Sequence, residues 1–145
     1  LITVTGQAQG RVIGIGGAFF RSPDPAALAR WYRDTLGLPV EDWGDTSGCS
    51  FEPDRMPPHS FAVWGAFRAD TEYFGKLSQQ FMLNLVVDDL ERALERVAAA
   101  GGRVLPERED QDYGRFGWFV DPDGHRVELW EPPATPPEDD GADHE

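Results

Sequence analysis

An internal duplication constrains the fold of this chain more than any single residue does. Residues 17–40 and 82–105 are related by a shift of 65 positions. In each copy, an aspartate suited to a helix N-cap precedes a run with helical spacing of apolar residues, and glycine then precedes an apolar, strand-like run. A unit of this size cannot bury a sheet face alone, so the two halves are expected to pack against each other.

The same order of strands and helix is predicted in both halves. The first half is predicted to hold one helix, between Asp24 and Gly37, and strands at 11–21, 38–41, 49–52 and 60–67. The second half is predicted to hold one helix, between Asp89 and Gly101, and strands at 79–87, 103–105, 113–120 and 125–130. Each half is therefore a βαβββ module, and the segment 68–78 is interpreted as a linker between the modules.

The length of 145 residues suits one domain made of two small halves that share a core. Residues 1–10 are predicted to be a flexible lead-in. The domain is expected to span 11–132, with modules at about 11–67 and 79–132. Residues 133–145 are rich in proline and acid and are predicted to be a disordered tail.

Charge and cysteine content exclude several classes of protein. The net charge is −13, and it is still about −8 when the five acids of the tail are left out. This negative charge argues against nucleic acid as a partner. No apolar run approaches the roughly 18 residues of a membrane span. Cys49 is the only cysteine, so no disulfide can form within the chain, and it is interpreted as a small strand hydrophobe. We expect a cytoplasmic protein that binds neither nucleic acid nor membranes.

Three stretches carry a resemblance to a known superfamily: FFRSPDPAALARWYRDTLGL, LNLVVDDLERALERVAAAGGRV and GRFGWFVDPDGHRVELWEP. Together they resemble the vicinal oxygen chelate superfamily, which includes glyoxalase I, extradiol dioxygenases and bleomycin-resistance proteins. The resemblance covers essentially the whole domain. It implies an α+β fold in which two tandem βαβββ modules form a curved mixed sheet around a pocket.

The resemblance also implies where a metal would bind in the metal-dependent members. Four side chains converge on the ion there, and they map to Gly17, Met82, Glu128 and a position within 62–64. Glycine has no side chain, methionine offers only a thioether, and 62–64 (Ala-Val-Trp) has no oxygen or imidazole ligand. One carboxylate cannot hold a divalent ion, so no metal and no other cofactor are expected.

The same positions predict a pocket lined mainly by apolar side chains. Strand alternation places Arg126, Glu128 and Trp130 on one face of the last strand. The predicted ligand-binding residues are Phe19, Trp64, Met82, Asn84, Arg115, Trp118 and Glu128. Glu128 and Tyr113 are the candidates for acid–base catalysis.

Two of these assignments have alternatives. Glu128 is interpreted as a desolvated carboxylate that binds a cation or acts as a base, or else as an acid of the strand that lies at the surface or is paired with Arg126. Tyr113 and Arg115 either form the rim of the pocket or belong to a solvated loop.

Three functions are compatible with this sequence. The favoured hypothesis is metal-free binding of a small, partly aromatic or cationic molecule. Bleomycin-resistance proteins are the precedent, and because they usually bind across a dimer, a homodimer is expected. The second is a glyoxalase-like lyase or dioxygenase. Such an enzyme would use either a metal that is not evident from the sequence, or Glu128 and Tyr113 as acid and base. The third is a protein-interaction module whose pocket is filled by side chains.

Overall fold

The computed structural model describes Gly10 and residues 17–134. The predicted lead-in, Gly10 apart, the first part of the strand expected at 11–21, and the tail beyond Ala134 lie outside the described residues.

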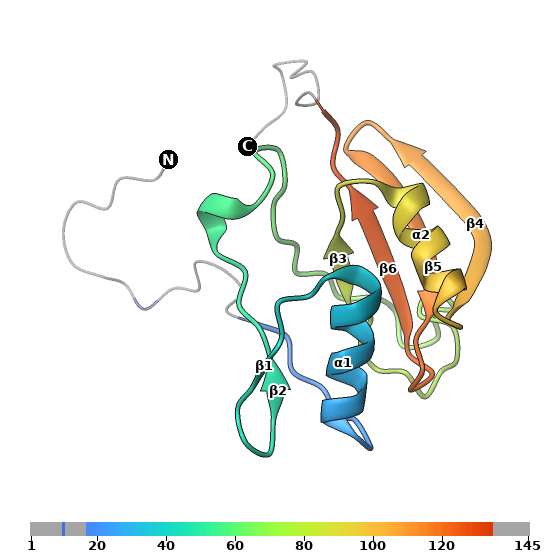
Figure 1. Ribbon diagram of the computed structural model, residues 1–145. Coiled ribbons are helices and arrows are strands. Elements are labelled where there is room, and N and C mark those ends of the chain that lie inside the picture. Colours follow the sequence, from blue (N-terminus) through green and yellow to red (C-terminus); the bar gives the residue numbers. More distant parts are fainter. Residues whose placement is uncertain (1–9, 11–16, 135–145) are drawn as a thin grey trace.

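A four-stranded mixed sheet from the second half forms the centre of the molecule (Figure 1). Its strands are β3 (Asn84–Val86), β4 (Arg103–Gln111), β5 (Gly114–Val120) and β6 (Arg126–Glu131), in the spatial order β3-β6-β5-β4. The β3 strand is parallel to β6, whereas β5 is antiparallel to both β6 and β4. The register of β4 against β5 shifts between Val104 and Arg108, and β4 continues well beyond the predicted end at residue 105.

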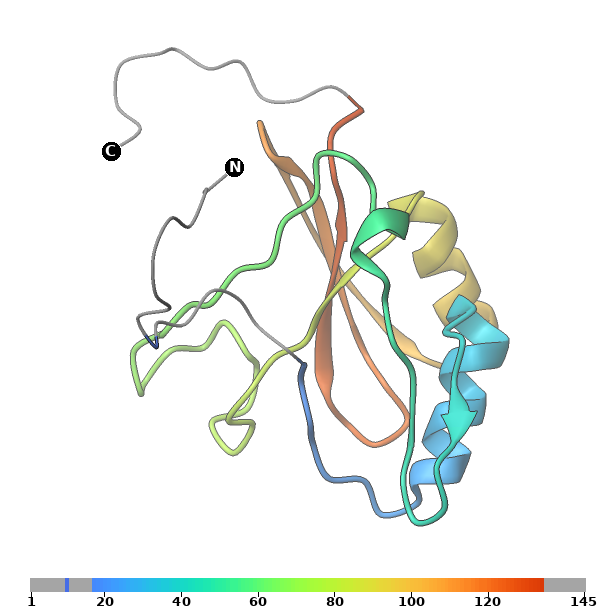
Figure 2. The same cartoon turned by 90° about the vertical axis from the view of Figure 1, so that its left-hand side faces the viewer.

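The two predicted helices, α1 (Pro25–Leu36) and α2 (Leu90–Ala99), are confirmed and lie on one face of the sheet (Figure 2). Asp24 accepts a hydrogen bond from the backbone N–H of Ala27, and Asp89 accepts one from that of Arg92, each at 3.1 Å. These N-caps satisfy donors that the first helical turn leaves without partners. Among the described residues, no helix combines the length and the apolar character that crossing a membrane requires.

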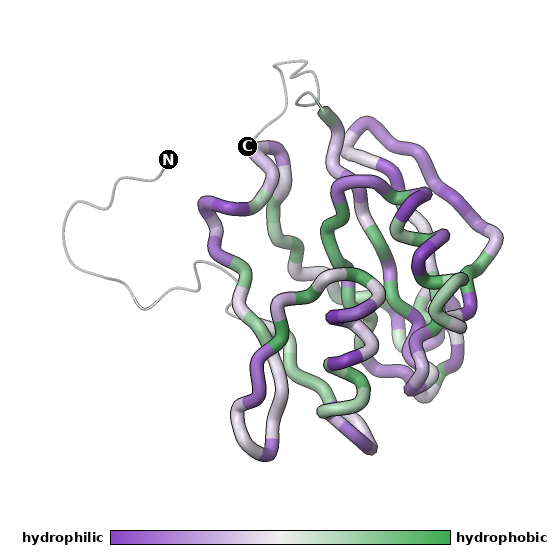
Figure 3. The backbone as a smooth tube through the Cα atoms, viewed as in Figure 1, coloured by the Kyte–Doolittle hydropathy of each residue, from purple (hydrophilic) through white to green (hydrophobic). Residues whose placement is uncertain are grey.

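The hydrophobic core lies between the helices and the sheet. The most completely buried side chains there are Leu90, Val97, Phe119, Val127 and Leu129. The tube coloured by hydropathy shows hydrophobic and hydrophilic positions alternating along the helices and the sheet strands (Figure 3). Gly117 of β5 lets α2 approach closely, because a Cβ atom there would lie 2.8 Å from Leu94 Cδ1.

The first half differs from the prediction. Its strands are β1 (Glu41–Asp42) and β2 (Ser47–Gly48), which form a two-stranded hairpin, and the 3-10 helix η1 (Pro53–Arg55) follows. The strands predicted at 49–52 and 60–67 are wrong, and 17–21 forms no strand. A strand is stabilised by its neighbours, and neither 49–52 nor 60–67 is paired with a strand among the described residues. Pro53, Pro57 and Pro58 also remove donors that a sheet ladder needs.

The α+β class is confirmed, with the two helices packed on one face of the mixed sheet. The chain from the first half and the linker passes over the opposite face (Figure 2). Because side chains alternate along a strand, every second side chain of the sheet points to that face and away from the helices.

Candidate functional site

The side chains of β5 and β6 alternate as predicted between the two faces of the sheet. Phe119 is buried under the helices, whereas Trp118 stands opposite Glu128 on the other face. Asn84 of β3 is the Cα partner of Glu128 on the other side of β6. Three neighbouring strands thus place Asn84, Glu128 and Trp118 in one row across the sheet.

The Glu128 carboxylate is buried and hydrogen-bonded by three donors. Its side chain has 7% relative exposure. Its Oε1 accepts a hydrogen bond from Asn84 Nδ2 at 2.7 Å, and its Oε2 accepts one from Trp118 Nε1 at 2.9 Å and another from the Tyr73 hydroxyl. Donors to both oxygens stabilise the ionised carboxylate and offset the cost of its burial.

Arg126 does not form an ion pair with Glu128. Its guanidinium carbon lies 5.7 Å from the centroid of the Trp118 ring, in a cation–π arrangement. The side-chain amide of Gln79 bonds both the N–H and the C=O of Arg126, each at 2.8 Å, and so takes the place of a strand partner there. The alternative in which Arg126 pairs with the carboxylate is therefore excluded by the geometry.

Tyr73 belongs to the cluster, although the sequence does not single it out. It lies in the 68–78 linker and stacks on Phe67, with ring centroids 5.4 Å apart and planes 12° apart. Its ring also meets that of Trp118 edge-on at 6.0 Å. Burial, followed by the hydrogen bond to Glu128, raises the pKa of the Tyr73 hydroxyl above its usual value. The hydroxyl is thus held in the protonated form that donates to the carboxylate.

The other predicted site residues lie away from this cluster. Phe19 and Trp64 are 92% and 81% exposed. Met82 is half-buried just before β3. Arg115 lies on the helix-facing side of the sheet, where it pairs with Asp110 and Glu91. Of the seven predicted ligand-binding residues, the structure therefore brings together Asn84, Trp118 and Glu128.

Tyr113 lies at the turn between β4 and β5 and is 45% exposed. Its backbone carbonyl accepts a hydrogen bond from Trp130 Nε1 at 2.8 Å, and its ring meets that of Phe116 edge-on. Its hydroxyl makes no hydrogen bond to a described residue. Tyr113 therefore stands at the rim of the sheet, apart from the Glu128 carboxylate.

The residues around Glu128 do not fit the divalent ion of the metal-dependent superfamily members. A catalytic zinc ion needs about three protein ligands that offer lone pairs. Tyr73, Trp118 and Asn84 instead direct O–H and N–H groups at the carboxylate. Within 17–134, no three histidine, cysteine or acidic side chains come together as a ligand set.

A second polar cluster surrounds the buried carboxylate of Asp121. Its Oδ2 accepts a hydrogen bond from the Tyr32 hydroxyl at 2.9 Å, and its Oδ1 accepts from the backbone N–H groups of Asp123 and His125, each at 2.9 Å. His125 Nδ1 also lies 3.1 Å from Oδ2. This network fixes the turn before β6 to helix α1, which is a structural role.

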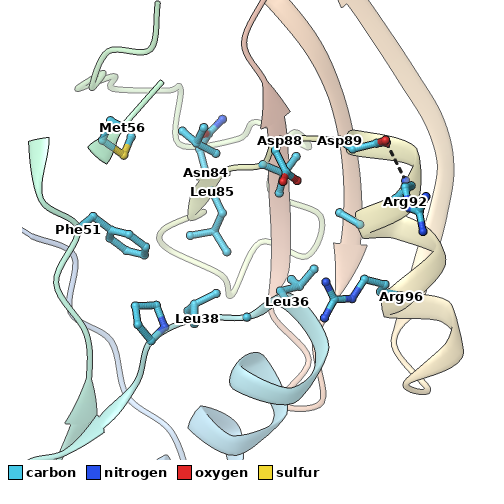
Figure 4. Close-up of a pocket in the computed structure, with 15 residues that line it drawn as sticks. Leu36, Leu38, Phe51, Met56, Asn84, Leu85, Asp88, Asp89, Arg92 and Arg96 are labelled. Carbon is cyan, nitrogen blue, oxygen red and sulfur yellow. Dashed lines mark hydrogen bonds between the residues drawn. The ribbon is translucent and has the colours of Figure 1, made fainter. Parts of the chain in front are cut away.

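A cleft of about 900 Å³ opens on the other side of the Asn84 strand (Figure 4). It lies between the C-terminal end of α1, the segment around η1, strand β3 and the first turns of α2. Its apolar walls include Leu36, Leu38, Phe51, Met56 and Leu85. Asn84 is the only predicted site residue that lines it.

Residues 17–130 match the protein family described as "Glyoxalase-like domain". No curated protein matches the chain. Similar solved structures include TnmS3, an antibiotic binding protein from Streptomyces sp. CB03234. Its sequence is 22% identical, the match covers 76% of this chain and 88% of that chain, and the TM-score is 0.44. Lactoylglutathione lyase from Agrobacterium tumefaciens matches at 20% identity, 76% and 86% coverage, and a TM-score of 0.43. The oxidase ChaP-H2 matches at 22% identity, 81% and 91% coverage, and a TM-score of 0.48.

Proposed function

Because the chain belongs to the family of glyoxalase-like domains, in the vicinal oxygen chelate superfamily, we propose that it is a metal-free binding protein for a small aromatic cation. The observation that carries this proposal is the Glu128 carboxylate, set among aromatic rings on the sheet face away from the helices. Small-molecule sites commonly combine apolar and aromatic walls with a few well-placed polar groups.

The rings around Glu128 suit a flat, positively charged ligand. Trp118 and Tyr73 adjoin the carboxylate, and Phe116 stacks on Trp130 farther along the same face, with centroids 6.2 Å apart. A ligand that carries both a ring and an ammonium group would gain from cation–π contact and from the carboxylate.

Such a ligand competes with Tyr73 for the carboxylate. The Tyr73 hydroxyl shares Oε2 of Glu128 with Trp118, whereas Oε1 has Asn84. Tyr73 lies on the linker, outside the helices and strands, so its displacement breaks no backbone ladder. We infer that the bound ligand takes the place of the tyrosine ring and hydroxyl.

Calorimetric titration with 2-naphthylmethylammonium, compared with neutral 2-naphthalenemethanol, tests the proposal. The cation is expected to bind more tightly, and Glu128→Gln to lower its affinity about ten-fold or more, because a charge-assisted contact is lost. Glu95→Gln, an exposed change on α2, serves as the matched control and should leave affinity unchanged. Equal affinity for both probes, or no effect of Glu128→Gln, contradicts the proposal.

Enzymatic activity of the lyase or dioxygenase kind is the alternative, and metal content separates it from binding alone. Elemental analysis after incubation with Zn²⁺, Ni²⁺, Mn²⁺ and Fe²⁺ is expected to give less than about 0.1 metal per chain, since several ligands are normally required. Near-stoichiometric metal that Glu128→Gln abolishes would overturn the metal-free proposal. In a metal-free enzyme, Glu128 or Tyr113 would have to act as acid or base.

We further infer a homodimer, which acts in the cytoplasm. The dimer is supported by the exposed apolar side chains of the first half and of the strand entry, among them Phe19, Trp64 and Phe81. Clusters of such side chains are typical of interfaces. Light scattering after size-exclusion chromatography should give twice the mass of the chain, and a concentration-independent monomer would contradict the inference.

A further inference from the structure

We propose that the cleft between the end of α1 and the start of α2 is a second binding site, for a small amphipathic carboxylate. Its apolar body would lie against Leu38, Phe51 and Leu85, and its carboxylate on Arg96. This site differs from the Glu128 site, which lies on the opposite side of β3. Asn84 is the one lining residue that also belongs to the Glu128 cluster, and its amide is bound to the carboxylate there.

The size and walls of the cleft suit a small organic molecule. Its volume of about 900 Å³ lies within the range of roughly 300–1,000 Å³ that small-molecule sites occupy. Four separate parts of the chain line it: the residues 36–39, the segment that contains Phe51 and Met56, strand β3 with the residues that follow it, and the first turns of α2. Apolar surface that these segments leave uncovered would be removed from water by a ligand.

Two arginines at the edge of the cleft have no acidic partner among the residues that the structure describes. Arg92 and Arg96 are four residues apart on α2, and so lie on the same side of the helix. Neither side chain forms an ion pair or a hydrogen bond with a described residue. Arg108 and Arg115, by contrast, both pair with Glu91 on the same helix. In a chain with 26 acidic residues, two adjacent unpaired guanidinium groups favour an anionic ligand.

The acidic residues that line the cleft lie at the opposite end from Arg96. Asp89 is engaged as the N-cap of α2, and Asp88 precedes it. Arg96 lies about 9 Å along the helix axis from Leu90, at a rise of 1.5 Å per residue. Figure 4 shows its side chain reaching toward Leu36, away from both aspartates. The basic end of the cleft is therefore separated from the acidic end, and a guanidinium can grip a carboxylate with two parallel hydrogen bonds.

Titration with 2-naphthoate tests this site, with neutral 2-naphthalenemethanol as the uncharged probe. The carboxylate is expected to bind about ten-fold more tightly than the alcohol, and Arg96→Gln to remove that advantage. Arg33→Gln changes an exposed arginine of α1 that pairs with Asp34, and it should have no effect. Equal affinity of the wild type and Arg96→Gln for 2-naphthoate, or no binding at all, overturns the proposal.

A second variant separates this site from the Glu128 site. Met56→Trp fills the cleft from a position outside the core, and is expected to abolish 2-naphthoate binding while leaving 2-naphthylmethylammonium binding intact. Glu128→Gln should have the opposite pattern. If 2-naphthoate binding instead follows Glu128→Gln, the cleft is not the site. If Arg96→Gln changes the mass in solution, a second copy of the chain occupies the cleft, and the small-molecule assignment is wrong.

Discussion

The Glu128 carboxylate is the residue on which the site depends, and the chain itself provides its hydrogen bonds. Trp118 and Asn84 donate from neighbouring strands, and Tyr73 donates from the linker that covers the sheet. Burying a carboxylate without partners is strongly unfavourable, so each donor contributes to the stability of the fold as well as to the site.

Replacing Tyr73 by phenylalanine should lower the free energy of unfolding by about 1–3 kcal/mol, because a buried charged acceptor loses one donor. Urea denaturation at neutral pH measures the change. Tyr113→Phe is the matched control, since its hydroxyl bonds no described residue, and it should shift stability by less than about 0.5 kcal/mol. Equal effects of the two substitutions would show that the Tyr73 hydrogen bond does not stabilise the protein.

Stability should also fall in strong alkali because of two tyrosines, Tyr32, which is buried, and Tyr73, which is half-buried. Burial raises the pKa of Tyr32, beside Asp121, and of Tyr73, beside Glu128. Unfolded tyrosine loses its proton near pH 10, whereas the folded protein keeps these protons to higher pH. The unfolded state then binds fewer protons, so the free energy of unfolding decreases as pH rises above about 10. Urea denaturation at a series of pH values above about 10 should show that the free energy of unfolding declines less steeply with pH in Tyr73→Phe than in the wild type. An equally steep decline would contradict the raised pKa of Tyr73.

The sequence predicts part of this residue cluster and misses the rest for a physical reason. Strand alternation and the resemblance predict that Glu128 and Asn84 line the same pocket. Tyr73 reaches Glu128 across 55 residues from a linker without periodicity, so no local pattern indicates the contact. The predicted place of Arg115 in the pocket fails because the observed register of β5 directs it toward Glu91 of α2.

At the scale of elements, helix α2 is held at both ends of its first turn. Asp89 caps the backbone N–H of Arg92, and Glu131 of β6 accepts a hydrogen bond from that of Leu90 at 2.8 Å. The second bond ties the start of the helix to the end of the sheet. Of the two arginines of the proposed cleft, Arg92 lies in this first turn and Arg96 in the next, so their placement depends on these caps.

Asp89→Ala should therefore cost about 1 kcal/mol of stability, the usual cost of losing an N-cap. Asp88→Ala is the matched control, because the Asp88 side chain bonds no described residue and its removal should cost only a few tenths of a kcal/mol. Thermal unfolding followed by circular dichroism compares the two variants. A greater loss in Asp88→Ala would mean that the cap is wrongly assigned.

The elements that sequence patterns predict well are those with strong local signals. Both helices have an aspartate N-cap and an apolar stripe, and the second-half strands have β-branched and aromatic residues bounded by turns. The stretch 60–67 has a similar composition but forms no strand, because composition does not supply a pairing partner.

At the scale of the whole molecule, the two faces of the second-half sheet have different roles. One face packs on α1 and α2 and forms the core, whereas the other carries Glu128, to which Tyr73 of the linker donates. The chain of the first half and the linker passes over this second face (Figure 2). Exposed aromatic side chains such as Phe19 and Trp64 belong to that first half. A ligand that binds at Glu128 must therefore displace or pass the chain that covers this face. We expect the NMR signals of residues on this face to respond to the ligand, and those of residues between the sheet and the helices not to respond.

The measurement that tests this most directly is the indole N–H region of a ¹⁵N-correlation NMR spectrum during titration with 2-naphthylmethylammonium. Trp118→Phe and Trp31→Phe assign the two diagnostic signals. The Trp118 indole donates to Glu128, whereas the Trp31 indole donates to the Ala100 carbonyl on the helix side. We expect the Trp118 signal to shift saturably and the Trp31 signal to stay in place. A shift of Trp31 alone, or no shift of Trp118 at saturating probe, would contradict ligand binding at Glu128.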